Sequence, residues 1–146
     1  MSTEHPSLIK HLEFIQISIV RMAANSFIIK GWAVTLVAAI LAFTAKDANP
    51  KAASIALIPA VMFWGLDAYY LRTERVFRAL YDNVRKGVAN KDEEVDFSLD
   101  TSSLERKVSP WLRVVFTKTL VPFYIALIAV IFAVWLGTPH LIGGTK

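Results

Sequence analysis

Cysteine is absent from this sequence of 146 residues, and its absence removes several classes of chemistry. Without thiols the chain forms no disulfide framework, no thiolate metal site and no cysteine nucleophile. The three histidines, His5, His11 and His140, are scattered along the chain, and no HExxH, GxSxG or glycine-rich phosphate loop occurs. The sequence therefore predicts a protein that is not an enzyme, with no catalytic residue, no metal site and no cofactor.

Charge is also missing from long parts of the chain. Hydrophobic residues make up 55% of the sequence and charged residues only 19%, and the charges are segregated instead of spread. Three stretches are almost uncharged: 31–45 has no charge, 52–71 has only Asp67, and 119–136 has none. A helix needs about 20 apolar residues to cross the hydrocarbon core, within a range of roughly 17–25. The three stretches therefore predict three transmembrane helices.

The first stretch reaches the required length by extension toward the N-terminus. Lys30 is the single interruption between it and the preceding residues 26–29. Its ammonium group must therefore extend to the membrane interface while its methylene stem stays in the apolar layer. A soluble three-helix core is the alternative. Buried helices of soluble proteins usually carry a polar face, which these stretches lack, so the sequence favours a membrane.

The predicted fold class is an all-α membrane protein with a single membrane domain over residues 1–146. An N-terminal cytoplasmic helix over 7–30, with Ser7 as its cap, leads into the first span. The segment 72–118 joins the second span to the third and is also cytoplasmic. The spans leave only short connections on the other side, so the function must reside in the membrane or on the cytoplasmic side.

Within the cytoplasmic segment the pattern changes twice. Residues 72–87 are expected to extend the helix of the second span and to end at Gly87, because glycine commonly terminates a helix. Residues 89–105 are acidic and polar, which predicts a flexible loop. Pro110 is then expected to open the third helix.

Basic residues predict the orientation of the chain. With a cytoplasmic N-terminus, thirteen lysines and arginines lie inside and three lie outside, as the positive-inside rule requires. The predicted localisation is therefore the bacterial inner membrane, multi-pass, with the N-terminus in the cytoplasm. The inner set is Lys10, Arg21, Lys30, Arg72, Arg75, Arg78, Arg85, Lys86, Lys91, Arg106, Lys107, Arg113 and Lys118, and the outer set is Lys46, Lys51 and Lys146.

One ion pair is predicted within the spans. Spans one and two are antiparallel about a turn midway between Lys46 and Lys51, so residues whose numbers sum to about 97 lie at similar depth. Lys30 and Asp67 meet on this rule. A charge inside a span costs about 2.5–3.5 kcal/mol on insertion scales and usually finds a partner. Two interpretations stay open: a gate at the inner mouth of a pore, and a salt bridge that only fixes the hairpin.

Small residues recur at helical spacing in two spans and favour a homo-oligomer, because they let neighbouring helices approach closely. Packing within one chain is the alternative. No span carries a repeated polar stripe, so a hydrophobic constriction is favoured over a permanently wet pore. Trp64 lies deeper in its span than the tryptophans and tyrosines near the ends of the spans, and it is expected to pack against a neighbouring helix. The small residues are Gly31, Thr35, Ala38, Ala42 and Ala45 in span one, and Ala126, Ala129, Ala133 and Gly137 in span three.

A basic stripe follows span two and has two interpretations. The first is a topology signal that attracts anionic headgroups, worth about 1 kcal/mol per basic residue. The second is a site for a nucleotide or oligonucleotide, in which Arg72, Arg75 and Arg78 bind phosphates and Tyr70 offers a ring for stacking. No known nucleic-acid-binding signature accompanies these residues.

Two segments carry a family resemblance: NSFIIKGWAVTL (25–36) and FWGLDAYYLRTERVFRALYDNVR (63–85). They resemble a family of small bacterial membrane proteins, the membrane effectors of anti-phage defence of the Hailong type. The resemblance covers residues 8–88, whereas 89–146 match only in kind. The matching motif residues are Asn25, Lys30, Gly31, Trp32, Asp67, Tyr70, Arg72, Glu74, Arg75 and Arg78.

The resemblance implies an oligomeric membrane channel that DNA oligomers keep shut. A partner nucleotidyltransferase makes the oligomers, and infection removes them. We therefore expect a ligand-gated ion channel whose partners are the lipid bilayer, further copies of itself and a single-stranded DNA or nucleotide ligand. Two alternatives remain: a non-catalytic membrane anchor or adaptor, and an accessory subunit of a transporter.

Overall fold

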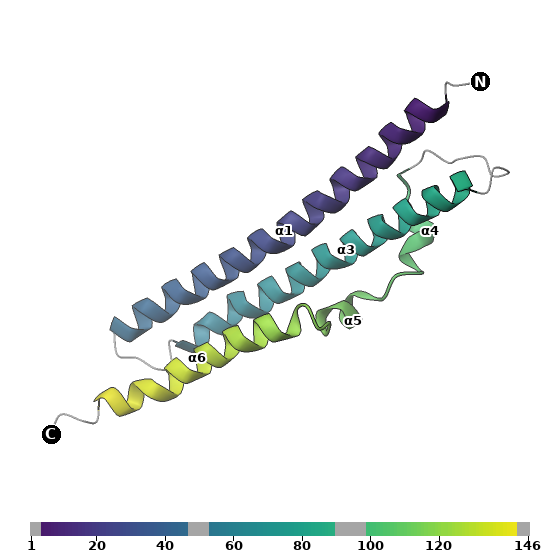
Figure 1. The fold of residues 1–146 in the computed structure, drawn as a ribbon. Coiled ribbons are helices and arrows are strands. Elements are labelled where there is room, and N and C mark those ends of the chain that lie inside the picture. The colour runs from purple at the N-terminus through teal and green to yellow at the C-terminus, as the bar shows by residue number, and fades with distance from the viewer. Residues whose placement is uncertain (1–3, 47–52, 90–98, 143–146) are drawn as a thin grey trace. The chain divides into compact units, whose positions relative to one another are not determined.

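The computed structural model describes residues 4–46, 53–89 and 99–142, and these residues form helices without a strand (Figure 1). This confirms the all-α prediction. A turn of 3-10 helix, η1 (Ser54–Ala56), leads into α3. The α-helices are α1 (Glu4–Lys46), α3 (Leu57–Ala89), α4 (Ser102–Glu105), α5 (Trp111–Val115) and α6 (Val121–Ile142).

The chain divides into two compact units, and both long helices contribute to each. The first unit, called the arginine unit below because it contains Arg72, Arg75 and Arg78, consists of Met1–Ser26 and Tyr69–Val114. The second, called the apolar unit, consists of Phe27–Ala68 and Val115–Lys146.

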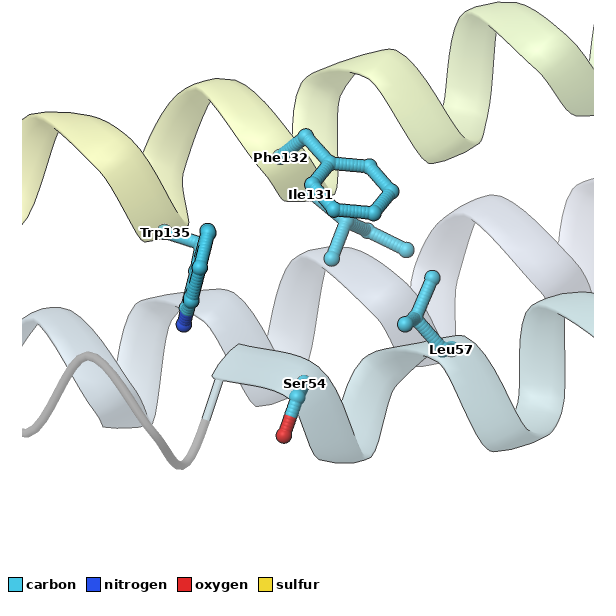
Figure 2. Close-up of a pocket in the computed structure, with 5 residues that line it drawn as sticks. All are labelled: Ser54, Leu57, Ile131, Phe132 and Trp135. Carbon is cyan, nitrogen blue, oxygen red and sulfur yellow. The ribbon is translucent and has the colours of Figure 1, made fainter.

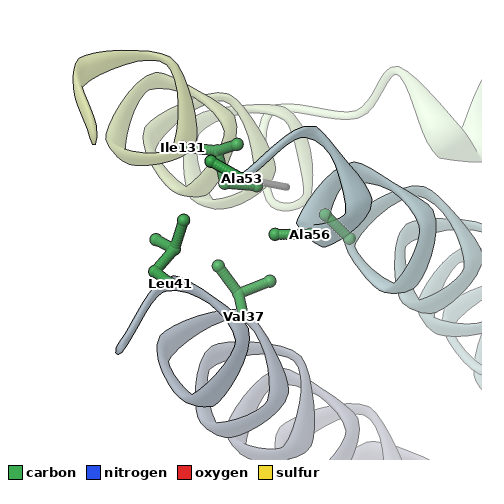
Figure 3. Packing of buried hydrophobic residues seen from close by; sticks show 6 residues of the cluster. Val37, Leu41, Ala53, Ala56 and Ile131 are labelled. Atoms are coloured by element: carbon green, nitrogen blue, oxygen red, sulfur yellow. The ribbon is translucent and has the colours of Figure 1, made fainter. Parts of the chain in front are cut away.

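Small residues form the centre of the apolar unit. Val37 and Leu41 of α1 point toward Ala53 and Ala56, and Ile131 of α6 completes the cluster (Figure 3). The four-residue spacing of Val37 and Leu41 places them on one face of their helix. Alanine side chains opposite them allow the backbones to approach closely.

In the arginine unit the core is a second apolar cluster. Ile15 of α1, Leu80 and Val84 of α3, and Leu104 of α4 are all buried. Leu80 and Val84 are four residues apart and therefore lie on one face of α3. The cluster fixes the N-terminal part of α1 and the short helix α4 against the same face of α3.

Two helices are long and apolar enough to cross a membrane, over Pro6–Ala45 and Ser54–Gly87. Only 22% of the most apolar window of each is buried inside the chain, whereas the core helix of a soluble protein buries most of its apolar face. Phe27 and Phe43, for example, are 79% and 72% exposed. A third apolar helix, Val121–Gly137, is shorter, so the third span stays a prediction.

The helix boundaries correct two predictions. α1 is one continuous helix that begins at Glu4, so Ser7 lies inside its first turn and is not the cap. α3 continues past Gly87 to Ala89, so the glycine does not end it. Pro59 lies in the first turn of α3, where its missing N–H has no intrahelical acceptor to lose.

The prediction that one helix runs onward from Pro110 is wrong. A short helix, α5, follows this proline and ends at Val115, and α6 begins only at Val121. Pro122 lies in the first turn of α6. Its ring leaves no N–H for the carbonyl of Lys118 and crowds it, which disfavours a regular helical turn immediately before α6. The N–H groups of Leu120 and Val121 donate to the carbonyl of Thr117 instead.

The described end of the acidic segment contains a helical turn that the sequence did not predict. The turn is α4, and its Leu104 is 5% exposed. Just before it, the N–H of Ser102 donates to Oδ1 of Asp100 at 2.9 Å, which holds the pKa of this exposed carboxyl below its usual value. Residues 90–98 lie outside the described residues, as does the connection over 47–52.

Candidate functional site

Three helices of the apolar unit each contribute one polar side chain to a buried network. Nζ of Lys30 on α1 lies 2.6 Å from Oδ2 of Asp67 on α3. The hydroxyl of Tyr124 on α6 lies 3.1 Å from the same carboxylate oxygen. The contact expected from the antiparallel register is therefore present, and its role as gate or as structural pair stays a prediction.

Tyr124 is the member of this network that the sequence did not reveal. Its ring is fully buried, and its hydroxyl lies within donating distance of Asp67 and of the carbonyl oxygen of Phe63, at 3.2 Å. A phenol needs a hydrogen-bond partner when it is buried. The available signal was one tyrosine inside an otherwise apolar stretch of 18 residues, 119–136.

Trp64 holds this network from the side. Its ring stacks on Tyr124 with centroids 5.6 Å apart and an interplanar angle of 7°, so the expectation that it packs against another helix is confirmed. Its Nε1–H donates to the carbonyl of Val115 at 3.0 Å. Val115 is the last residue of α5, so no later helical N–H can donate to its carbonyl. The indole supplies that donor instead.

Burial differs between the two charges. The side chain of Asp67 is 0% exposed and that of Lys30 is 21% exposed. A buried carboxylate is costly unless it is paired and hydrogen-bonded, and Asp67 receives both kinds of contact. Lys30 has a flexible stem, and its side chain is already partly exposed. Removal of Lys30 is therefore expected to destabilise the protein more than removal of Asp67, because it leaves a buried carboxylate without its counter-charge. Separation of the three helices would break the ion pair and expose Asp67.

The arginines of the predicted ligand site lie on α3 in the arginine unit. Arg72 donates through Nη2 to the backbone carbonyl of Glu105 at 3.3 Å. Arg78 donates through Nε to Oε1 of Glu74 at 2.7 Å. Arg75 makes no ion pair with any residue that the structure describes. Arg78 is thus paired with Glu74 and Arg72 is in contact with Glu105, whereas Arg75 has no acidic partner among the residues that the structure describes.

Their angular positions restrict what one ligand can touch. Residues on an α-helix are about 100° apart, so Arg72 and Arg78 lie roughly 120° apart around α3, and Tyr70 lies roughly 160° from Arg72. Tyr70 instead meets Tyr69 edge to face, with centroids 5.7 Å apart. Arg75 lies roughly 60° from both Arg72 and Arg78, so a compact ligand can contact it together with either arginine, whereas Tyr70 and Arg72 cannot both contact such a ligand.

A groove of about 400 Å³ lies between the start of α3 and α6 in the apolar unit (Figure 2). It is lined by Ser54, Leu57, Ile131, Phe132 and Trp135. No charged group lines it, so it suits an apolar group and offers no chemistry. Within the described residues, no cluster of three or more histidine and carboxylate side chains is placed to hold a metal ion.

The small residues noted in the sequence face away from the rest of the chain. All five small residues of the set on α1 and all four of the set on α6 are exposed. A Cβ atom added at Gly31 or at Gly137 would meet nothing within 4 Å. Packing within the chain uses a different face of α1, on which Ala33 and Val37 are buried. The small residues are therefore available for a contact outside the chain.

No known protein family, curated protein or solved structure matches this chain. Its functional interpretation therefore rests on the buried network of Lys30, Asp67 and Tyr124, on the arginines of α3, and on the distribution of apolar surface.

Proposed function

We propose that this chain is an integral membrane protein that assembles into an ion channel and serves as an effector of bacterial anti-phage defence. Its three spans leave the N-terminus and the arginine unit in the cytoplasm, where an anionic oligonucleotide made by a partner nucleotidyltransferase holds the channel closed. The observation that carries the proposal is the outward-facing apolar surface of two long helices. Only 22% of the most apolar 18-residue window of each helix is buried inside the chain.

The membrane setting follows from what this surface would do in water. Exposed apolar patches larger than a few hundred Å² are rare on soluble monomers and mark a membrane or a partner. Phe27 of α1 and Met62 of α3, at 79% and 69% exposed, belong to this surface. Lipid tails would cover both, and Asp67, the one acid that is 0% exposed among the described residues, keeps Lys30 as its counter-charge.

Self-association is supported by the exposed small residues. Lipid tails are as apolar as the helices, so the hydrophobic effect does not drive helices together in a membrane. Helices associate there by close packing of small side chains instead. The set on α1 repeats at intervals of three and four residues, as one helix face requires. A cyclic oligomer built on this face would place one α1 from each subunit around an axis.

The charges on α3 support the proposed position of the ligand. Arg75 has no acidic partner among the described residues, and Arg78 is 62% exposed although it pairs with Glu74. Phosphates that neutralise these arginines on adjacent subunits would remove the repulsion between them and hold the helices together. Loss of the ligand would restore the repulsion and widen the constriction.

One observation favours the adaptor alternative. Ile9, Phe14 and Ile17 of α1 are more than half exposed in the arginine unit, and an apolar helix face of this kind also suits a protein partner. The channel is preferred because the small residues of α1 and α6 give a route to assembly without any second protein.

Membrane potential separates the two functions. Full-length protein expressed without a nucleotidyltransferase is expected to depolarise cells, as followed with a voltage-sensitive dye, whereas an adaptor leaves the potential unchanged. Ala38→Leu is expected to abolish depolarisation, because a larger side chain on the exposed face blocks close helix packing. Its protomer should fold normally.

The matched control is Ala33→Leu, which changes a fully buried alanine on the same helix. Overpacking there costs about 1–3 kcal/mol of protomer stability. An assembled channel would be contradicted if cells that express the wild type at a high level keep their normal membrane potential. It would also be contradicted if Ala38→Leu depolarises cells fully.

A further inference from the structure

The short helix α4 is held on α3 by few contacts. Leu104 is its one residue in the core cluster, where it packs with Ile15, Leu80 and Val84. The other three residues of α4 are exposed. A helix of four residues has no stability of its own, so the docked position of α4 depends on this leucine and on the polar contact beside it.

That polar contact is to Arg72. Its Nη2 donates to the backbone oxygen of Glu105 at 3.3 Å, and the carboxylate oxygen Oε2 of Glu105 lies 3.9 Å from the same nitrogen. Nε of Arg72 is buried and has no hydrogen-bond partner among the described residues. The docked helix thus gives the arginine one good acceptor and leaves another donor unused.

This arrangement conflicts with anion binding by Arg72. A guanidinium group holds a phosphate or carboxylate through two parallel N–H groups, along either its side edge or its end edge. Nη2 carries one N–H group on each edge, and the carbonyl oxygen of Glu105 accepts one of them. In the docked state the buried Nε is not available for the side edge, and the carboxylate of Glu105, 3.9 Å from Nη2, repels a phosphate that approaches this nitrogen.

We propose that α4 is a built-in competitor for the anionic ligand: Glu105 holds Arg72 in the docked state, and a phosphate of the ligand takes its place when α4 leaves. The inference rests on the proposed oligonucleotide ligand and adds the regulation of its site. Arg75 and Arg78 give the ligand its first contacts, and Arg72 becomes available only after undocking, when Nε and Nη2 are both exposed to the phosphate.

The coupling is reciprocal. A ligand that binds the undocked state better must shift α4 away from α3, and a change that weakens docking strengthens binding in proportion to the rise in the undocked fraction. Glu105→Gln removes the competing charge, and Leu104→Ala removes the apolar anchor, without touching an arginine. Both variants are expected to bind the ligand more tightly than the wild type.

The test combines affinity with a distance. Because the chain has no cysteine, spin labels at Asn83→Cys on α3 and Ser103→Cys on α4 report docking in the full chain in detergent micelles. The probe is a single-stranded hexamer of deoxyadenylate at 100 mM salt. Saturating hexamer is expected to shift the label distances to longer values, and Glu105→Gln to lower its Kd about three- to tenfold.

Asp82→Asn is the control, since it removes one negative charge from the exposed side of α3; its effect on Kd should stay below about twofold. Leu104→Ala is a second arm that should also lower the Kd. Hexamer binding with unchanged label distances, or equal effects of Glu105→Gln and Asp82→Asn, overturns the competitor role alone. If the hexamer binds neither the wild type nor any variant, the proposed ligand is overturned, and the competitor role with it.

Discussion

Lys30→Met is expected to destabilise the protein by about 3–5 kcal/mol, the usual cost of removing one partner from a buried ion pair. The remaining carboxylate of Asp67 is fully buried and would lose its positively charged partner, while the hydroxyl of Tyr124 stays in contact with it. A neutral O–H donor does not replace an opposite charge beside a desolvated carboxylate. Unfolding in mixed detergent micelles, followed by circular dichroism, measures the loss.

Asp67→Asn should be milder, at about 1.5–3 kcal/mol, the value of a hydrogen bond to a charged group. The lysine is partly exposed and its ammonium can extend to the interface, while the new amide oxygen still accepts from Tyr124. This order of effects reverses if Lys30 is the more buried charge in the membrane.

The double variant Lys30→Met with Asp67→Leu distinguishes a structural pair from a gate. Replacing a whole ion pair by apolar residues of similar size is often neutral or stabilising, so protomer stability should return to within about 1–2 kcal/mol of the wild type. A pair that only fixes the hairpin then leaves the membrane potential of expressing cells like that of the wild type. A gate instead gives depolarisation that the ligand no longer suppresses.

Arg75→Glu combined with Arg78→Glu is expected to weaken binding of the deoxyadenylate hexamer by about a hundredfold at 100 mM salt, because two phosphate contacts become repulsions. The dependence of log K on log salt should become shallower by about 1.4, since each phosphate neutralised on a single strand contributes about 0.7. Fluorescence anisotropy of a labelled hexamer gives both values. In cells that also express the nucleotidyltransferase, this variant should depolarise the membrane.

The control for charge is Arg106→Glu combined with Lys107→Glu, which changes the net charge equally at two exposed residues just after α4. Its affinity should fall by less than about tenfold, through long-range repulsion alone. Equal losses in the two double variants would mean that the ligand responds to overall charge and has no site on α3.

Contacts set by periodicity were predictable from the sequence. Lys30 and Asp67 follow from counting residues on either side of a turn, and the register of two antiparallel helices leaves little freedom at that depth. The sequence also predicted that the helix of residues 52–71 continues over 72–87, and α3 does so, with Leu80 and Val84 buried on one face. Both predictions depend on regular helix geometry, the first across a short turn and the second along one helix.

Contacts that depend on three-dimensional packing were not predictable. Tyr124 sits in an apolar run, and nothing in that run shows that its hydroxyl meets Asp67 from another helix. Leu104 stands between polar neighbours and belongs to no apolar repeat, so its burial in the cluster of Ile15 is set by tertiary contact. The exposed face of α1 was readable as small residues, but only the structure shows that no part of the described chain covers it.

The most direct test of the account is the side of the membrane on which each part of the chain lies. The absence of cysteine allows single substitutions at Ser54, before α3, and at Ser102, in α4, to be probed with a membrane-impermeant maleimide in intact spheroplasts. We expect Ser54→Cys to react from outside and Ser102→Cys to react only after permeabilisation. Reaction of both residues from the same side, or recovery of the protein in the soluble fraction, would contradict the membrane crossing on which the channel and its cytoplasmic ligand depend.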